Sequence, residues 1–265
     1  AGTYYVWYRV FGDANHNDTK PASVAVRIGQ KPLTITGVTA ASKPYDGTKN
    51  ADISSVTFDN VTLKRDTDYT VTASFDDASV GSGKNVTATV SLMEQAAKNY
   101  ALEQSSFTTT ASITAKQVTV SGITAKDKVY DGTNDATLDC SNAKFDGILK
   151  NDKLTVAANG MFETAVAGKQ NVAISGLTLG GASAANYVLA GSGNQAQTSA
   201  TITAKEVTVT PDNQSKVYEE KDPDLTYKVS GVLDGETLKD ITLARAEGEN
   251  AGEYDITGTA DAGAN

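Results

Sequence analysis

Apolar and polar residues alternate along several short stretches of the chain. In the clearest stretch Val86, Ala88, Val90 and Leu92 are apolar, and Thr or Ser fills the positions between them. Successive side chains of a β-strand point to opposite faces, so a period of two predicts strands with one buried and one solvated face. Threonine suits the solvated face because its β-branched side chain fits a pleated surface.

Turn-forming residues separate these stretches, and helical patterns are scarce. The segments Gly81-Ser82-Gly83-Lys84 and Val166-Ala167-Gly168-Lys169 stand where neighbouring strands are expected to reverse. A helix is expected over one short stretch, around Met93 to Lys98. The pattern therefore predicts a mainly β protein.

The chain repeats itself. Segment 43–48, which contains Tyr-Asp-Gly-Thr, returns at 128–133, and a degraded third copy follows at 216–218. Asn-Tyr pairs recur at 99–100 and 186–187, and a Thr-rich stretch precedes each copy of the first motif. Landmarks that keep their order at a spacing of about 85 residues indicate tandem modules.

The landmarks divide the chain into four pieces. Residues 1–29 are expected to be the closing strands of a preceding module, and residues 206–265 a module that lacks its last strand. Two full modules, 30–116 and 117–205, are expected between them. The two ends also look alike in sequence, so we interpret the chain as a segment of a longer array. Such terminal half-modules are expected to pair end to end between molecules by strand addition.

Modules of this length, made of short strands and glycine turns, fold as β-sandwiches or small mixed β folds. The expected fold class is mainly β, with tandem small sandwiches of the immunoglobulin type arranged in a rod. A β-grasp-like sheet with a short helix in each module is the alternative. The connections between modules are short, which restricts hinge motion.

The repeated residues also carry a family resemblance. Two copies of Tyr-Asp-Gly-Thr, each preceded by Lys-x and a Thr-rich strand, resemble the YDG repeat of bacterial surface proteins. The third module, with Lys216-Val217-Tyr218 and Gly231-Val232-Leu233, is similar to the companion β-rich MBG-type repeat, although Glu219-Glu220 stands where Asp-Gly is expected. The resemblance implies a stalk or adhesin-type protein that is secreted or wall-associated. It implies no catalytic residue.

Composition narrows the function classes. A net charge of -9 argues against a nucleic-acid partner, because phosphate binding needs a concentrated Lys/Arg surface. No stretch has the apolar length of a membrane-spanning helix, so no membrane insertion is expected. The single cysteine, Cys140, excludes a disulfide framework and a cysteine-based metal site. The single histidine, His16, excludes most histidine-dependent catalysis.

The repeated motif supplies the first candidate site. A tyrosine beside a carboxylate can stack on a sugar and hydrogen-bond to it. We favour a structural interpretation, in which Asp-Gly forms a tight turn with positive φ and the tyrosine covers the edge of the core. The residues concerned are Tyr45, Asp46, Gly47, Tyr130, Asp131, Gly132 and the degraded Tyr218.

Two further candidates lie near the N-terminus. Tyr5 and Trp7 point to one side of a predicted strand, where exposed aromatic rings would offer a platform for a glycan or a protein. Asp13, Asn15 and Asn17 place oxygen ligands at alternate positions, the spacing with which a loop wraps Ca²⁺. That loop has Asp18 where the Ca²⁺ loop needs glycine, and no Glu closes it, so Ca²⁺ is a weak candidate and no cofactor is expected.

Together these observations predict a non-enzymatic stalk or adhesion repeat region of a bacterial cell-surface protein. The expected location is extracellular, at the cell surface or wall, and the expected partner is a glycan or protein of a host or cell surface. The alternative is a set of carbohydrate-binding modules appended to a secreted glycan-active enzyme. A solvent-facing Tyr5–Trp7 platform that binds oligosaccharide would support that alternative.

Overall fold

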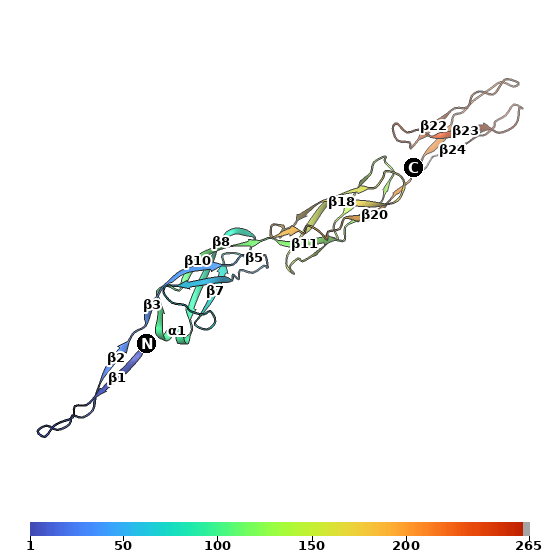
Figure 1. Ribbon diagram of the computed structural model, residues 1–265. Helices are drawn as coiled ribbons and strands as arrows, with labels where there is room; N and C mark the ends of the chain where they lie inside the picture. The colour runs from blue at the N-terminus through green and yellow to red at the C-terminus, as the bar shows by residue number, and fades with distance from the viewer. Residues whose placement is uncertain (262–265) are drawn as a thin grey trace. The chain divides into compact units, whose positions relative to one another are not determined.

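Short β-strands joined by turns make up most of residues 1–261, the part of the chain that the computed structural model describes (Figure 1). The prediction of a mainly β chain is confirmed. The α-helix of this part, α1 (Glu94–Asn99), lies where the helix was expected, with Glu94 in its first turn and Lys98 in its last. These charges suit the helix dipole. The choice between an immunoglobulin-type sandwich and a β-grasp-like sheet stays a prediction.

Contacts divide the chain into two units, each of which takes in segments from more than one part of the sequence. The first unit contains Ala1–Gln117 together with Leu149–Asn151 and Ala185–Val188. The second contains Val118–Ile148, Asp152–Ala184 and Leu189–Asn265. The predicted module boundaries at 29, 116 and 205 stay predictions.

The main sheet of the first unit has the strand order β5-β10-β8-β7. Its antiparallel part joins β10 (Ser106–Thr114) to β8 (Gly81–Leu92) and β8 to β7 (Tyr69–Phe75), while β5 (Lys43–Pro44) pairs with β10 in parallel. Along β8, Val86, Ala88 and Val90 are at most 1% exposed, and the residues between them face solvent. The period of two in the sequence thus predicted both this strand and its buried face.

Smaller sheets complete the first unit. β4 (Ile35–Ala40) pairs with β6 (Ile53–Phe58) in antiparallel fashion, and β3 (Lys31–Leu33) pairs with β9 (Tyr100–Leu102) in parallel. An antiparallel hairpin of β1 (Gly2–Tyr8) and β2 (Ala22–Ile28) comes before them.

The second unit repeats the main sheet of the first with one strand more. Its order is β13-β20-β18-β17-β14, made of β13 (Lys128–Val129), β20 (Gln197–Thr203), β18 (Gly168–Gly180), β17 (Thr155–Phe162) and β14 (Asp135–Ala136). The short strand β13 pairs with β20 in parallel, as β5 does with β10. Tandem β-rich repeats are therefore present in the fold as well as in the sequence.

The remaining elements of this repeat are short. β11 (Lys116–Ser121) pairs with β16 (Lys144–Asp146), and β12 (Thr124–Ala125) pairs with β15 (Leu138–Asp139), both in antiparallel fashion. The 3₁₀ turn η1 (Ala184–Asn186) precedes β19 (Tyr187–Leu189) and corresponds to α1 in the first repeat. Gly181, three residues before the start of η1, has φ of +96°, which is outside helical geometry.

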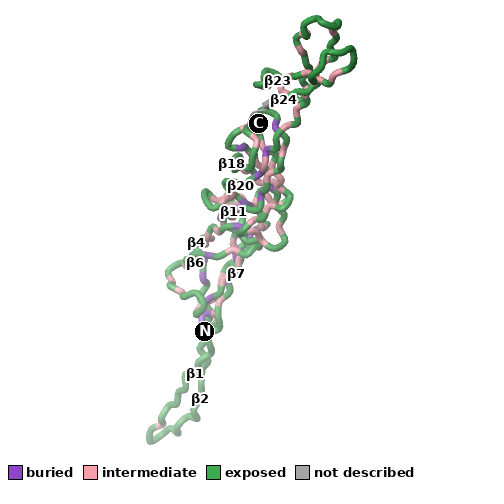
Figure 2. The backbone as a smooth tube through the Cα atoms, turned by 90° about the vertical axis from the view of Figure 1, so that its right-hand side faces the viewer, coloured by how far each residue is buried: buried purple, intermediate pink, exposed green. Residues whose placement is uncertain are grey.

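The C-terminal part of the second unit consists of two strand pairs, β21 (Thr208–Pro211) with β22 (Tyr227–Ser230) and β23 (Lys239–Arg245) with β24 (Ile256–Asp261). Side chains from 206 to 259 are exposed or half-buried, in contrast to the buried interior of the two repeats (Figure 2). Within residues 1–261, no helix has the length and apolar character needed to cross a membrane.

Candidate functional site

The Tyr-Asp-Gly segments form two turns with nearly the same backbone, which we call the signature turns. Each follows the short strand that pairs in parallel with the last strand of its repeat, and Gly47 and Gly132 have φ of +75° and +77°. Glycine adopts this left-handed conformation without the steric cost that a Cβ brings. The backbone N–H of Tyr45 donates to Thr114 O at 2.8 Å, and that of Tyr130 donates to Thr203 O at 2.8 Å.

In each signature turn, the lysine of the preceding short strand hydrogen-bonds to residues of the turn. Lys43 Nζ donates to Asp46 Oδ1 at 2.8 Å and to the carbonyl oxygen and Oγ1 of Thr48 at 2.9 and 3.0 Å. In the second copy, Lys128 Nζ makes the same three bonds to Asp131 and Thr133, at 2.7, 2.8 and 2.9 Å. All three N–H donors of the lysine ammonium therefore bind oxygen atoms of the turn.

The aspartate of each turn accepts from both the lysine and the threonine. Asp131 Oδ1 accepts the backbone N–H of Thr133 at 2.9 Å and its hydroxyl at 2.8 Å. These bonds, above all the one from Lys128, hold the pKa of the Asp131 carboxyl at about 2. In the first copy burial alone would raise the pKa of Asp46, but the bonds from Lys43 and Thr48 outweigh it and lower the pKa.

One aromatic ring lies beside the lysine of each signature turn. The ammonium of Lys43 lies 5.7 Å from the ring centroid of Phe75, and that of Lys128 lies 5.7 Å from the ring of Phe162. Both phenylalanines are only 2% exposed, so each lysine bridges the turn and the core of its repeat.

The signature tyrosines are buried, at 7% exposure for Tyr45 and 9% for Tyr130. Within the first unit, the rings of Tyr45 and Tyr187 meet edge to face, with centroids 5.5 Å apart. Within the second unit, the Tyr130 hydroxyl hydrogen-bonds to the Glu236 carboxylate, which raises the pKa of Tyr130. This geometry supports the structural interpretation of the signature, because its polar groups are engaged within the protein.

The third, degraded copy is built differently. Tyr218 is 59% exposed, and Lys216 Nζ pairs with Asp222 Oδ1 at 2.8 Å and Glu249 Oε2 at 2.7 Å. Arg245 joins both carboxylates, at 3.1 Å to Asp222 and 3.0 Å to Glu249. Lys216 thus still binds carboxylates, which here come from Asp222 and Glu249 and not from the aspartate position of the motif. Sequence analysis did not predict this network, because Arg245 and Glu249 lie far from Lys216 in the chain.

The N-terminal hairpin presents two different faces. Directly opposite residues share a face, and Tyr4 pairs with Val26 and Val6 with Val24, which makes one face apolar. On the other face Tyr5 pairs with Ala25 and Trp7 with Ser23. Tyr5 is 62% exposed and Trp7 69% exposed.

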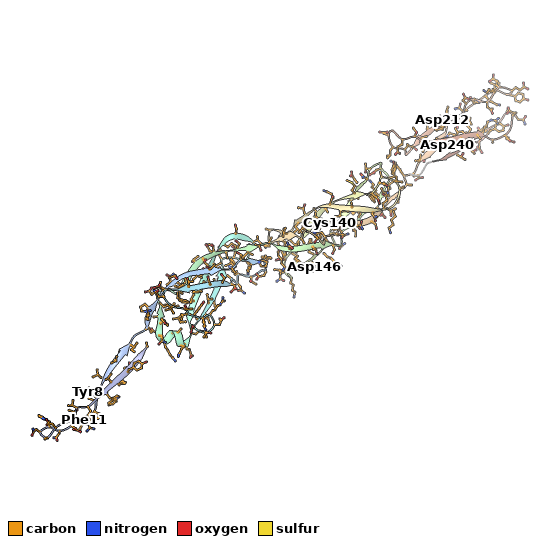
Figure 3. All side chains as sticks on the ribbon, in the orientation of Figure 1. Tyr8, Phe11, Cys140, Asp146, Asp212 and Asp240 are labelled. Carbon is orange, nitrogen blue, oxygen red and sulfur yellow. The ribbon has the colours of Figure 1, made fainter. Side chains whose placement is uncertain are left out.

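Further aromatic residues are exposed near the tip of the hairpin. Tyr8 and Phe11, marked in Figure 3, are 54% and 75% exposed, and the Arg9 guanidinium lies 4.5 Å from the ring centroid of Phe11. The hairpin therefore exposes aromatic rings on both faces. The Tyr5–Trp7 platform stays a prediction.

The weak Ca²⁺ candidate lies in the loop between β1 and β2. Asp13 Oδ1 accepts the backbone N–H of Asn15 at 2.8 Å and lies 2.7 Å from His16 Nδ1. The bond from Asn15, followed by the one from His16, lowers the pKa of Asp13. Asp13 thus folds onto its own loop as an Asx turn. Among residues 1–261, no group of three His, Cys, Asp or Glu side chains is placed to hold a metal ion.

Two other features lie in the second unit. Cys140, labelled in Figure 3, is half-buried and packs beside the cluster of Val120, Ile123, Val156 and Ile174. A small hollow is lined by Tyr227, Val229, Gly231, Val232, Glu236, Thr237, Leu238 and Ile241. All of its lining residues lie between 227 and 241, where no motif in the sequence predicts a hollow.

Comparison with known families agrees with the repeated geometry. The YDG domain family matches residues 29–109 and again 114–200, and the MBG domain (YGX type) matches residues 207–265. The expected resemblance to YDG repeats followed by an MBG-type module is confirmed. Searches of the curated proteins and of the solved structures found no match to the chain.

Proposed function

The chain belongs to the YDG domain family, and from this premise we propose that it is a non-enzymatic spacer region of a secreted bacterial cell-surface protein. In this role the repeats transmit tension and hold a functional part of the protein away from the cell. The family matches show that the chain consists of β-rich repeat modules, which are compatible with a structural or binding role.

The position of the last strand in each repeat carries the proposal. β10 lies between β5 and β8, and β20 lies between β13 and β18. The chain leaves each repeat through this strand, so a pull along its axis loads the hydrogen bonds on both sides together. An edge strand would have one ladder to resist the same pull.

The signature turns add to this resistance. The bond from the Tyr45 N–H to Thr114 O extends the β5–β10 ladder beyond the strand ends, and Tyr130 does the same to Thr203. The lysine, aspartate and threonine of each turn hold that segment in place. These residues therefore stabilise the fold of their own repeat, and this supports a non-enzymatic role.

Single-molecule force spectroscopy on the whole chain tests the spacer role. We expect two discrete unfolding steps that release about 280 Å and about 300 Å of chain, as matches of 81 and 87 residues extended at about 3.5 Å per residue require. The two-stranded pairs β1–β2 and β23–β24 serve as internal controls and should extend at lower force. Smooth extension without discrete steps would contradict a load-bearing role.

Surface location is tested separately on cells that express the protein. An antibody against the chain should label intact cells, and added protease should remove the label without lysis. Labelling that appears only after lysis would rule out a cell-surface spacer.

A carbohydrate-binding role is the second candidate, and the exposure of Tyr5 and Trp7 on one face favours it. Neighbouring aromatic rings on a strand suit stacking on a sugar chain. In that case the chain would be a binding region attached to a glycan-active enzyme. The two roles separate by experiment, since only the second requires a soluble ligand.

A further inference from the structure

One type of loop packs on both signature turns. A Cβ placed on Gly47 would lie 3.2 Å from Leu149 Cδ1, and a Cβ placed on Gly132 would lie 3.2 Å from Leu233 Cδ1. Each leucine lies more than a hundred residues after the glycine that it covers. Nearly the same spacing and the same distance therefore occur twice.

The two loops are similar in sequence, and their glycines have similar φ angles. They are Gly147-Ile148-Leu149 and Gly231-Val232-Leu233, and their glycines have φ of +89° and +92°. We call them the leucine loops. The first belongs to a YDG match and the second to the MBG match. Two families of repeat thus present similar loops.

Polar groups accompany each leucine. In the first unit, the backbone N–H of Leu149 donates to the Tyr187 hydroxyl at 3.0 Å, and the Tyr187 ring packs edge to face on Tyr45. In the second unit, Glu236, three residues after Leu233, accepts the hydroxyl of Tyr130. In each unit a leucine therefore packs on the turn glycine, and a polar side chain contacts the signature tyrosine.

In the second unit the leucine also joins the core of the repeat that it covers. Leu233 packs against a cluster of buried side chains that includes Tyr130, Phe162 and Val172. In the third copy, where Glu219-Glu220 replaces Asp-Gly, the corresponding Tyr218 is 59% exposed. The signature tyrosine is thus buried in the two copies that have the glycine turn and its leucine, and exposed in the copy in which Asp-Gly is replaced.

We propose that each signature turn is a docking socket, and that its ligand is the leucine loop of the next repeat in the chain. The glycine has two functions in this socket. It adopts positive φ, and its missing side chain leaves room for the leucine. A YDG repeat can then be followed by any repeat that supplies Gly-(Ile/Val)-Leu with a polar partner. This inference rests on packing alone and holds whether the array acts as a spacer or as a binding region.

A double-mutant cycle tests the contact in the whole chain. Gly132→Ala presses a methyl group toward Leu233, and Leu233→Ala removes the group that it meets. If the two single changes in melting temperature were additive, their sum would predict the melting temperature of the double variant. We expect the measured value to be at least about 2 °C higher than that prediction, which corresponds to a coupling free energy of a fraction of 1 kcal/mol. Gly83 has φ of +60° with open space around its Cβ position, so Gly83→Ala with Leu233→Ala is the matched control and should be additive.

Cross-linking tests the same contact without relying on stability. In a Cys140→Ser background, Gly132→Cys with Leu233→Cys should form a disulfide under mild oxidation, whereas Gly83→Cys with Leu233→Cys should not. Should Gly132→Cys not fold, Tyr130→Phe with Glu236→Gln replaces it as a conservative cycle on the neighbouring bond. Additive cycles together with cysteines that stay free and reactive would overturn the docking socket.

Discussion

Lys128 binds Asp131 across the signature turn, with Nζ donating to Oδ1 at 2.7 Å, and the same lysine donates to Thr133. The Lys43–Asp46 pair reproduces this arrangement at 2.8 Å in the first repeat. Each lysine side chain is 18% exposed. Two copies with matching distances indicate that the lysine is part of the turn rather than a solvated surface charge.

We therefore predict that Lys128→Met lowers the melting temperature by about 5 °C, because the Asp131 carboxylate and the Thr133 carbonyl lose their shared donor. Lys43→Met should have a similar effect. Lys20→Met, at an exposed position, is the control and should change little. Thermal unfolding followed by circular dichroism measures all three. Equal melting temperatures for Lys128→Met and Lys20→Met would contradict a structural role.

The depressed pKa of Asp131 predicts a loss of stability in acid. Its pKa is about 2 in the folded protein against a usual 3.8, so the unfolded chain binds more protons between these values. The contribution of Asp131 to the free energy of unfolding is therefore present above about pH 4 and decreases as the pH falls toward 2. The pKa of Asp77 is also about 2, because Lys84 and Ser79 donate to it, and this carboxylate acts in the same direction.

Denaturant unfolding at a series of pH values between 2 and 5 checks this prediction. Asp131→Asn should flatten the fall in stability toward acid, since the substituted amide does not titrate. Glu247→Gln, at an exposed position, is the control and should leave the slope as it is in the parent chain. An unchanged slope for Asp131→Asn would show that this carboxylate is not linked to folding.

The strands and the repeats could be predicted from sequence, because both depend on local or repeated patterns. Alternation at Val86, Ala88 and Val90 predicted a strand and its buried face, and the copies of Tyr-Asp-Gly predicted two matching turns. The short helix after Leu92 followed from the one stretch with helical character.

The partners of the signature turns could not be predicted in this way. Leu149 and Leu233 are ordinary apolar residues in sequence, and their role depends on which turn the fold brings beneath them. Glu236 likewise gave no sign that it would bind Tyr130. In retrospect, the recurrence of Gly-(Ile/Val)-Leu at 147–149 and 231–233 was the available signal.

The Tyr5–Trp7 platform leads to a prediction about glycans. Trp7 is the single tryptophan of the chain, so its fluorescence reports directly on a sugar stacked at that face. If the platform binds, a panel of neutral and N-acetylated hexasaccharides should change the emission in a saturable way. Trp7 itself must be kept as the reporter.

Variants on the two faces of β1 make this test specific. Tyr5→Ala should weaken binding at least tenfold, the effect of about 1.4 kcal/mol expected for one lost aromatic contact. Tyr4→Ala, on the opposite face, is the matched control and should bind as the parent chain does. No emission change with any sugar of the panel would remove the glycan-binding role from this face.

The apolar face of the hairpin leads to the prediction of end-to-end pairing between molecules. Val6, Val24 and Val26 are 57%, 56% and 45% exposed on one face of the hairpin. A sheet that leaves such apolar residues uncovered tends to associate with another chain. The sequence likeness between Ala1–Tyr8 and Ala251–Gly258 makes a second copy of the chain the expected partner. Sedimentation should then show a mass that rises with concentration.

Variants at adjacent positions of β2 distinguish association through the apolar face from nonspecific association. Val24→Lys places a charge on the apolar face and should return the chain to a monomer, while Ala25→Lys places it on the opposite face and should leave association intact. Both variants carry the same change in net charge, so electrostatic repulsion alone cannot explain a difference between them. A monomeric mass for the parent chain at all concentrations would show that the two ends do not pair in solution.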